Sequence, residues 1–288
     1  MGKKYVLYNA KAGNTSQNKD INIKKLQGYY PDEALECIYL SEDFDYSGFI
    51  SSLEKDDQII ICGGDGTLNH FINSIDITAL KNDLYLFGTG SGNDFLRDLG
   101  YKKGEAPVLI TEYMKNLPLV YVNGKSYRFF NAIGFGLDGY CCERSDYLRS
   151  KGRKKVNYTV IALMGLFFRH KSSIAAITVD GKEHHFDNVW MAPTMFGTYF
   201  GGGALPAPAQ RRDNENHHVS LAIIHGKSKL FFLGVFPTLF KGTHTKYPSI
   251  ISIFEGHEVR VKFKEPCALQ IDGETIPNVL EYYVDSRL

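Results

Sequence analysis

The chain has 288 residues, a length sufficient for one large domain or two smaller ones. Its hydrophobic content of 43% supports a proper core, and its net charge of +1 at pH 7 disfavours a general nucleic-acid binder. The five cysteines are odd in number and show no CxxC spacing, which is typical of reduced thiols in a cytosolic protein. The longest apolar run, VIALMGLFF at 160–168, is about half as long as a membrane span of ~20 residues, so we expect no span.

Strand and helix patterns alternate through the first 117 residues. Strands are predicted at 4–9, 34–40, 58–62 and 83–88. The third, QIIIC, is a continuous apolar run of the kind that a parallel sheet buries on both faces. A helix over 68–75 follows it, and a short helix closed by Gly100 follows the fourth strand. This alternation predicts an α/β domain over 1–117, with ligand loops at the carboxyl ends of its strands.

From about residue 118 the pattern becomes mostly antiparallel β. Hairpins are predicted over 119–136, with Asn-Gly at the turn, and over 173–194, with Asp-Gly at the turn. HVSLAIIH and VRVKFKEPCALQIDGE are further strands, and 156–171 has a helical pattern. We expect a mostly antiparallel β-sandwich domain over 118–275, and we allow for a return of the segment 276–288 to the first domain.

One strand end carries an unusual glycine-rich sequence. Strand 58–62 runs into GGDGT at 63–67, and a helix pattern begins directly afterwards. Unpaired N–H groups and the dipole of a helix N-terminus attract phosphate, and glycines let it approach the backbone. A tight turn without a ligand explains one glycine, but not three with an acid between them. The absence of GxxxxGK[ST] disfavours a lysine-dependent P-loop enzyme. A second loop, GTGSGNDF at 88–95, follows the next strand, so both loops are predicted to share one nucleotide site.

Two later segments also carry acidic residues beside glycine. NAIGFGLDG at 131–139 contains a formal GxGxxG without a surrounding βαβ unit, so its Asp138 is of more interest than its glycines. IDGE at 271–274 is, from local pattern alone, a hairpin turn. Residues two apart on a strand face the same side, so Asp272 and Glu274 could converge on one site.

These motifs together resemble a known family. GGDGTLN, GSGNDF, FGLDG and IDGE occur in the order found in the diacylglycerol kinase catalytic-domain family, and the resemblance covers nearly the whole chain. GGDGT alone is shared with NAD kinases and phosphofructokinases, whereas the later motifs favour the lipid-kinase branch, which sphingosine kinases resemble. PTLFKGTHT at 237–245 is similar to the Gly-x-His segment of the family. The resemblance implies a two-domain lipid kinase, with a nucleotide-binding α/β domain and a β-rich lipid-substrate domain.

The resemblance also implies roles for single residues. The implied nucleotide-binding residues are Asn9, Ala10, Lys11, Ala12, Gly13, Ser41, Gly63, Gly64, Asp65, Gly66, Thr67, Leu68, Asn69 and Ser91. The acidic pair from which the general base is drawn matches Asp272 and Glu274, and the resemblance favours Glu274 as the proton acceptor. The acids of a magnesium network match Asp65, Asp94 and Asp138. Asp213 matches the ligand of a structural magnesium ion, although Asn214 replaces a glycine there.

The function implied by the resemblance is the transfer of a phosphoryl group from ATP, with Mg²⁺, to a lipid hydroxyl, above all diacylglycerol. The nucleotide is expected in the N-terminal domain, in the cleft that faces the β-rich domain. The alternatives are a sphingoid-base or NAD kinase and a non-catalytic module that binds nucleotide or lipid. The basic run at 150–158 is either a solvated loop or a contact with anionic lipid worth about 1 kcal/mol per charge. We therefore expect a cytoplasmic protein, peripherally associated with an anionic membrane surface, without a nucleic-acid partner and compatible with a homodimer.

Overall fold

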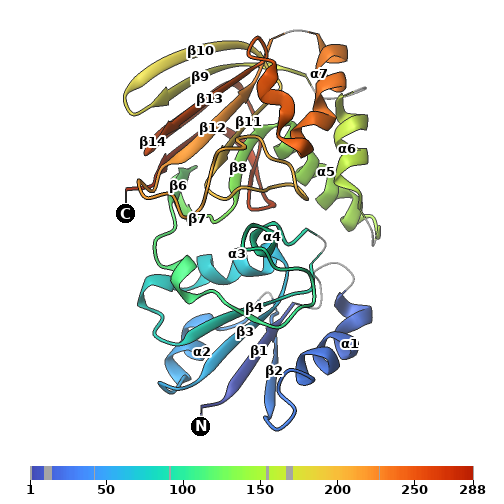
Figure 1. The fold of residues 1–288 in the computed structure, drawn as a ribbon, viewed down its shortest axis with the longest axis vertical. Helices are drawn as coiled ribbons and strands as arrows, with labels where there is room; N and C mark the ends of the chain where they lie inside the picture. Colours follow the sequence, from blue (N-terminus) through green and yellow to red (C-terminus); the bar gives the residue numbers. More distant parts are fainter. Residues whose placement is uncertain are drawn as a thin grey trace. The chain divides into compact units, whose positions relative to one another are not determined.

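The described residues of the computed structural model are 2–9, 15–41, 43–90, 92–153, 156–166, 171–226 and 228–287, and for 15–19 and 159 only the backbone is described. The chain divides into two compact units, Met1–Leu117 and Pro118–Leu288. Figure 1 colours the first from blue to green and the second from green to red.

The first unit alternates strands and helices in the predicted manner. Its strands are β1 (Lys4–Tyr8), β2 (Leu35–Tyr39), β3 (Gln58–Gly63), β4 (Asp83–Gly88) and β5 (Val108–Leu109). Its helices are α1 (Thr15–Gln27), α2 (Tyr46–Ser52), α3 (Asp65–Ser74), α4 (Asp94–Asp98) and the 3-10 helices η1 (Ile77–Ala79) and η2 (Thr111–Met114).

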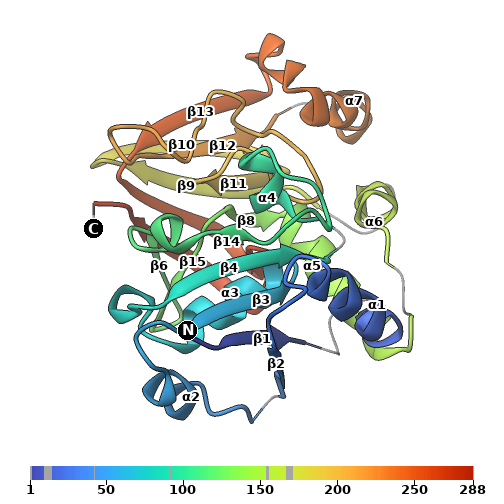
Figure 2. The ribbon, with the colours of Figure 1, turned by 60° about the horizontal axis from the view of Figure 1, so that its bottom comes forward.

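The five strands form one sheet in the order β2-β1-β3-β4-β5. β1 to β4 run parallel, and β5 is antiparallel to β4. Figure 2 shows β4, β3, β1 and β2 side by side. Ile59, Ile60 and Ile61 of β3 are fully buried, which explains the continuous apolar run and confirms the predicted parallel sheet. The chain leaves β1 toward β2 and returns to β3 on the other side, so the topological switch point lies between β1 and β3.

The second unit is mainly antiparallel. Its strands are β6 (Leu119–Val122), β7 (Lys125–Arg128), β8 (Ala132–Gly136), β9 (Ser173–Val179), β10 (Lys182–Val189), β11 (Met191–Met195), β12 (Val219–Ile224), β13 (Ile251–Gly256), β14 (Glu258–Ile271) and β15 (Glu274–Asp285). Its helices are α5 (Leu137–Ser150), α6 (Tyr158–Met164), α7 (Lys229–Val235) and the 3-10 helices η4 (Phe236–Lys241) and η5 (Thr243–Lys246).

The ten strands belong to one continuous sheet. The main path runs β13-β12-β11-β8-β14-β15-β6-β7, and β9 joins the first half of β14 and carries β10. The register of β14 shifts twice along its length, so its first half pairs with β9 and its second half with β8. The rings of His184 and Phe186 on β10 lie against Phe254 on β13, so these two strands contact each other through side chains although they are not paired. The predicted antiparallel β-rich domain is confirmed.

Asx-Gly turns close three of the hairpins. The first turn residue has a positive φ at Asn123, Asp180 and Asp272, and the glycine that follows each also has a positive φ. Two successive positive φ values are typical of the type I′ turn, which matches the twist of the flanking strands. The first predicted hairpin was too long, because its second strand, β7, ends at Arg128, and the next strand, β8, pairs with β11 and β14 instead.

Two further expectations need correction, and one helix was not expected. The C-terminal segment 276–288 does not return to the first unit, because β15 pairs with β14 and β6 inside the second sheet. The helix predicted over 156–171 is shorter, since α6 ends at Met164, and 167–170 lie outside the described residues. The helix α5 after β8 was not predicted from the sequence.

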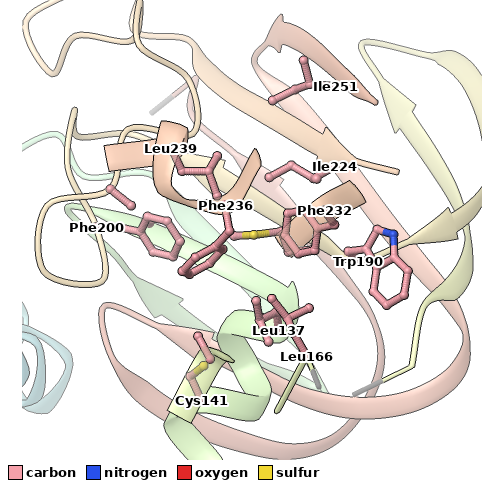
Figure 3. Packing of buried hydrophobic residues seen from close by; sticks show 14 of the residues in the cluster. Leu137, Cys141, Leu166, Trp190, Phe200, Ile224, Phe232, Phe236, Leu239 and Ile251 are labelled. Atoms are coloured by element: carbon pink, nitrogen blue, oxygen red, sulfur yellow. The ribbon is translucent and has the colours of Figure 1, made fainter. Parts of the chain in front are cut away.

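Three helices of the second unit pack on the sheet around a common core. Leu137 and Cys141 of α5, Leu166 after α6, and Phe232 and Phe236 from α7 and η4 are buried in one cluster with Trp190 and Ile224 of the strand region. Figure 3 shows these side chains meeting in the space between helices and strands. The core of this unit therefore joins α5, α6 and α7 to the sheet.

Candidate functional site

The predicted nucleotide residues of the first unit lie at one edge of its sheet. Asn9 follows β1, Ser41 lies just beyond β2, and Gly63 and Gly88 end β3 and β4. Because these four strands are parallel, all four positions are at the carboxyl edge. In open α/β sheets this edge, at the switch point, is where ligands bind. Ala10, Lys11, Ala12, Gly13 and Ser91 lie outside the described residues.

The two glycine loops contact each other through their backbones. A Cβ at position 64 would lie 2.9 Å from the Gly90 Cα, and one at position 90 would lie 2.5 Å from the Gly64 Cα. The Gly63 carbonyl accepts hydrogen bonds from the N–H groups of Thr89, at 2.8 Å, and of Gly90, at 3.3 Å. The glycines were predicted to admit a phosphate. The structure shows a second reason for them, since the loops could not approach each other this closely with side chains at these positions.

Asn93 supports this junction, and its role was not predicted. It has φ 53° and precedes α4, and asparagine adopts this left-handed conformation more readily than most residues. Its side-chain amide donates to the Gly90 carbonyl at 2.9 Å, and its Oδ1 lies near the positions that a Cβ would take at Gly64 and Gly90. The sequence indicated this role of Asn93 only by an asparagine placed between a glycine-rich loop and the start of a helix.

The N-terminus of α3 presents backbone rather than side chains. Thr67, Leu68 and Asn69 are buried, and the Leu68 N–H bonds to the Gly64 carbonyl as part of the helix. The fully buried Leu68 side chain belongs to the core of the unit. The first N–H groups of an α-helix have no partner within the helix. A ligand at this stretch would therefore meet the N–H groups of the first turn, including that of Gly66.

Asp65 links the two loops through its carboxylate. Its oxygens accept the N–H groups of Asp94, at 2.8 Å, and of Phe95, at 3.4 Å, at the start of α4. A Cβ at Gly92 would lie 3.7 Å from Asp65 Oδ2 and 3.9 Å from Asp94 Oδ2, so both carboxylates border the same small space. The structure thus brings together two of the predicted magnesium residues.

The two carboxylates of Asp65 and Asp94 suit Mg²⁺ better than a metal ion whose ligands must all come from the protein. Within the described ranges, no three His, Cys, Asp or Glu residues gather closely enough to hold a metal ion. Mg²⁺ is usually held by one or two carboxylates, with waters and substrate phosphate oxygens as its other ligands. Two carboxylates beside a helix N-terminus meet that requirement.

Asp138, the third predicted magnesium residue, is in the second unit, at the start of α5. Its side chain is buried, and neither carboxylate oxygen meets a hydrogen-bond partner of good geometry among the described residues. Burial raises the pKa of Asp138 to about 8, and the nearby N–H groups of Asp138 and Gly139 offset this only in part. A Cβ at Gly134 would lie 1.4 Å from Asp138 Oδ2, so the glycine makes room for the carboxylate. A buried carboxylate without a partner is a candidate metal ligand.

Asp272 is occupied by the backbone of the same unit. Its carboxylate accepts the N–H groups of Phe130, Asn131 and Ala132 at 2.9, 2.8 and 3.0 Å. It is the first residue of the turn between β14 and β15, so the expectation that it shares a strand face with Glu274 was wrong. Asp272 therefore anchors the hairpin to the segment before β8.

Glu274 begins β15 and has a different environment. Its side chain is exposed, yet the surrounding protein and the Asp146 carboxylate raise the pKa of Glu274, and Arg149 counteracts this in part. Asp146 is held by the Thr275 hydroxyl, which donates to its Oδ2 at 2.6 Å. An accessible carboxylate with a raised pKa is chemically suited to accept a proton.

The loop around Asp213 is the one expected to hold a structural magnesium ion. Asp213 is exposed, and the Asn214 amide closes the loop by donating to the Arg211 carbonyl at 2.7 Å and the His218 carbonyl at 3.1 Å. The buried Gln210 amide also donates to the His218 carbonyl, at 3.2 Å. Amide groups of the protein thus hold this loop, and the magnesium assignment of Asp213 stays a prediction.

Comparison with known proteins follows the same division of the chain. Residues 3–118 match the model of the diacylglycerol kinase catalytic domain. Residues 131–282, more than half of the chain, match that of the YegS C-terminal NAD kinase beta sandwich-like domain. The chain belongs to the family that combines a diacylglycerol kinase catalytic domain with a YegS-type C-terminal domain. The resemblance inferred from the motifs is confirmed.

Relatives in this family are distant in sequence and close in fold. A diacylglycerol kinase of Mycobacterium tuberculosis (strain CDC 1551 / Oshkosh) is 23% identical over 67% of this chain, and the match spans 63% of that protein's length. A diacylglycerol kinase of Bacillus subtilis (strain 168) is 22% identical over 95% of this chain and 90% of its own. The crystal structure of a diacylglycerol kinase from Bacillus anthracis str. Sterne matches 98% of this chain and 93% of its own with a TM-score of 0.68 and 22% identity. Among the described helices, none has the length and apolar character needed to cross a membrane.

Proposed function

We propose that this family member transfers the γ-phosphoryl group of ATP to the hydroxyl group of a lipid, with diacylglycerol as the first candidate and phosphatidic acid as its product. The observation that carries the proposal is the junction of two glycine loops at the carboxyl edge of a parallel sheet. There the Gly64 and Gly90 backbones touch, and Asp65 and Asp94 border one space.

The nucleotide site follows from this junction. The first-turn N–H groups of α3 and the helix dipole bind the phosphates, and Gly63 and Gly64 keep the approach free of side chains. Asp65 and Asp94 of the first unit would hold Mg²⁺. The family resemblance assigns Asp138, in the second unit, to magnesium as well. When bound, Mg²⁺ neutralises charge on the phosphates during transfer.

The acceptor side is assigned to the second unit. Glu274 takes the proton from the lipid hydroxyl, because its carboxylate is exposed and its pKa is raised toward the working pH. Asp272 holds the turn that positions Glu274 and does not itself act as base, since three N–H groups already engage its carboxylate. Most of the rate enhancement then comes from positioning and charge stabilisation.

We place the protein in the cytoplasm, peripherally bound to an anionic membrane surface, where such a substrate resides. Arg153 is exposed beyond the end of α5, and Lys154 and Lys155 lie outside the described residues. These cations suit contact with anionic headgroups.

An ATP-consumption assay with product analysis by mass spectrometry tests the proposal. Diacylglycerol, sphingosine and NAD are offered in parallel, with Asp65→Asn and Glu274→Gln as inactive controls. Turnover of a lipid that both variants abolish supports the proposal. Turnover of NAD alone would replace it with the NAD-kinase alternative, and nucleotide binding without turnover of any acceptor would leave a binding module.

A further inference from the structure

Charge is distributed unevenly along the second unit. Residues 147–179 contain no Asp or Glu, and neither do residues 216–254. Together the two segments hold 11 of the 33 Lys and Arg residues of the chain and none of its 32 acids. The rest of the chain carries 22 basic against 32 acidic residues, so the near-neutral total conceals a strongly basic part.

The two basic segments contain the helices α6 and α7. Asn157 caps α6 by accepting the Val160 N–H, and Ser228 caps α7 by accepting the Phe231 N–H. Both helices lie on the helical side of the second unit in Figure 1. Their inner side chains, such as Phe232, belong to the common core with α5.

The outer faces of these helices are apolar as well. Val160 and Met164, one turn apart on α6, are 49% and 57% exposed, and Leu230 and Phe231 on α7 are 74% and 39% exposed. A helix that faces water normally carries polar residues on its outer side. Single exposed apolar residues are ordinary, whereas each of these two short helices exposes a pair of them. We call these four side chains the α6/α7 face.

Basic and aromatic residues lie on the segments that adjoin these two helices along the chain. Tyr247, 40% exposed, follows η5 and its ring lies 6.4 Å from that of Phe231. Lys241 and Lys246 are exposed on η4 and η5. At the end of α5 the Lys151 ammonium lies 5.7 Å from the ring centre of the exposed Tyr147. Tyrosine and lysine around an apolar patch are typical of the membrane interface, where the rings and lysine stems are apolar and their ends are hydrated.

We propose that the α6/α7 face docks onto a bilayer that contains anionic lipid. Val160, Met164, Leu230 and Phe231 enter the boundary between headgroups and acyl chains, while the lysines of the adjoining segments contact the headgroups. A second copy of this chain is a less suitable occupant, because it would bring two basic segments together. The docking proposal rests on the proposed function in one respect, namely that a lipid substrate gives the protein a reason to bind a bilayer. Docking itself requires no turnover.

Vesicle flotation of the full chain tests the proposal. Vesicles of phosphatidylcholine alone are compared with vesicles of phosphatidylcholine and phosphatidylglycerol, at low and high salt. We expect binding to the anionic vesicles that weakens as salt screens the charges. The double variant Met164→Gln/Leu230→Gln should bind about tenfold or more weakly. The matched control is Leu109→Gln/Leu280→Gln, which changes two exposed apolar residues elsewhere and should bind like the parent.

A charge pair provides a second variant. Lys241→Gln/Lys246→Gln should weaken binding to anionic vesicles by about fivefold for each charge, whereas Lys125→Gln/Lys182→Gln, on exposed hairpin positions, should not. The docking proposal is overturned if the parent does not bind anionic vesicles or if the α6/α7 variant binds them like the parent. It is also overturned if light scattering shows that Met164→Gln/Leu230→Gln converts a dimer into a monomer without changing vesicle binding.

Turnover of a short-chain diacylglycerol that is soluble as a monomer separates this inference from the proposed function. The docking variants should keep the parent's turnover on that substrate, because no bilayer is involved. Vesicle binding without turnover of any lipid would refute the proposed function and leave the docking face standing. Turnover of a lipid without vesicle binding would support the proposed function and refute the docking face.

Discussion

Asp138→Asn is the most informative single substitution, because it removes one buried titratable group and keeps the shape of the side chain. The Asp138 carboxyl is buried, lacks a well-placed partner among the described residues, and has a pKa of about 8 instead of 3.8. Between these two pH values the folded state holds a proton that the unfolded state has released. The free energy of unfolding therefore falls as pH rises, and this contribution is fully present only below about pH 3.8.

The expected slope follows from linkage. One proton bound only in the folded state lowers the free energy of unfolding by about 1.4 kcal/mol per pH unit. Between about pH 5 and pH 7.5 the parent should lose roughly 3 kcal/mol from this group. The asparagine variant should lack that slope. Its absolute stability includes the cost of a buried amide, so the comparison concerns slopes and not single values.

Urea unfolding in EDTA over this pH range measures the effect. Trp190, the single tryptophan of the chain, is buried in the second unit and reports on that unit. The control Asp187→Asn removes an exposed carboxylate from the same unit and should follow the parent. If Asp138 serves Mg²⁺ as the family resemblance implies, added Mg²⁺ should stabilise the parent at high pH and not the variant. Parallel pH curves for parent and Asp138→Asn would refute the argument that the charge is buried without compensation.

Further predictions concern the loops and the acidic residues. Gly90→Ala places a Cβ 2.5 Å from the Cα of the opposing loop glycine and should weaken ATP binding by roughly tenfold or more, measured by calorimetry, whereas Gly234→Ala, with open space around it, should not. Asp272→Asn should destabilise the protein by about 1–3 kcal/mol in urea unfolding, because three backbone N–H groups lose a charged acceptor. Glu274→Gln should leave stability unchanged and lower kcat by roughly 10²–10⁴-fold, and equal losses of stability in both variants would contradict this division of roles. Asp146→Asn should lower the pKa of Glu274, so the acid limb of the kcat–pH profile should move to lower pH, and an unmoved limb would exclude Glu274 as the base.

Short-range patterns determined much of this protein. The buried run of β3 and the turn residues Asn123, Asp180 and Asp272 predicted strands and turns that the structure contains. Each of these features depends on a few neighbouring residues, because a type I′ turn needs only positive φ values and a strand buried on both faces needs only a continuous apolar run. The order of the motifs was sufficient to indicate the family.

Some elements were absent from the prediction because their own sequences carry little signal. Helix α1 is mostly polar, and α5 follows β8 through a glycine motif that resembled a nucleotide loop. Tertiary packing, and not local pattern, stabilises such helices. A return of 276–288 to the first domain was left open for a similar reason, because the local sequence does not indicate that β15 pairs with β14 and β6.

Only the tertiary structure decided what the chemically active residues contact. The sequence placed Asp272 and Glu274 two residues apart, but residues 130–132, far away in the chain, supply the N–H groups that engage Asp272, whereas Glu274 is exposed. In the same way, Gly64 must be a glycine partly because Gly90 lies against it, a contact that only the pairing of β3 with β4 creates. The pKa of a carboxylate, and whether a position must be glycine, depend on burial and on neighbours distant in sequence. Only the folded chain brings those neighbours together.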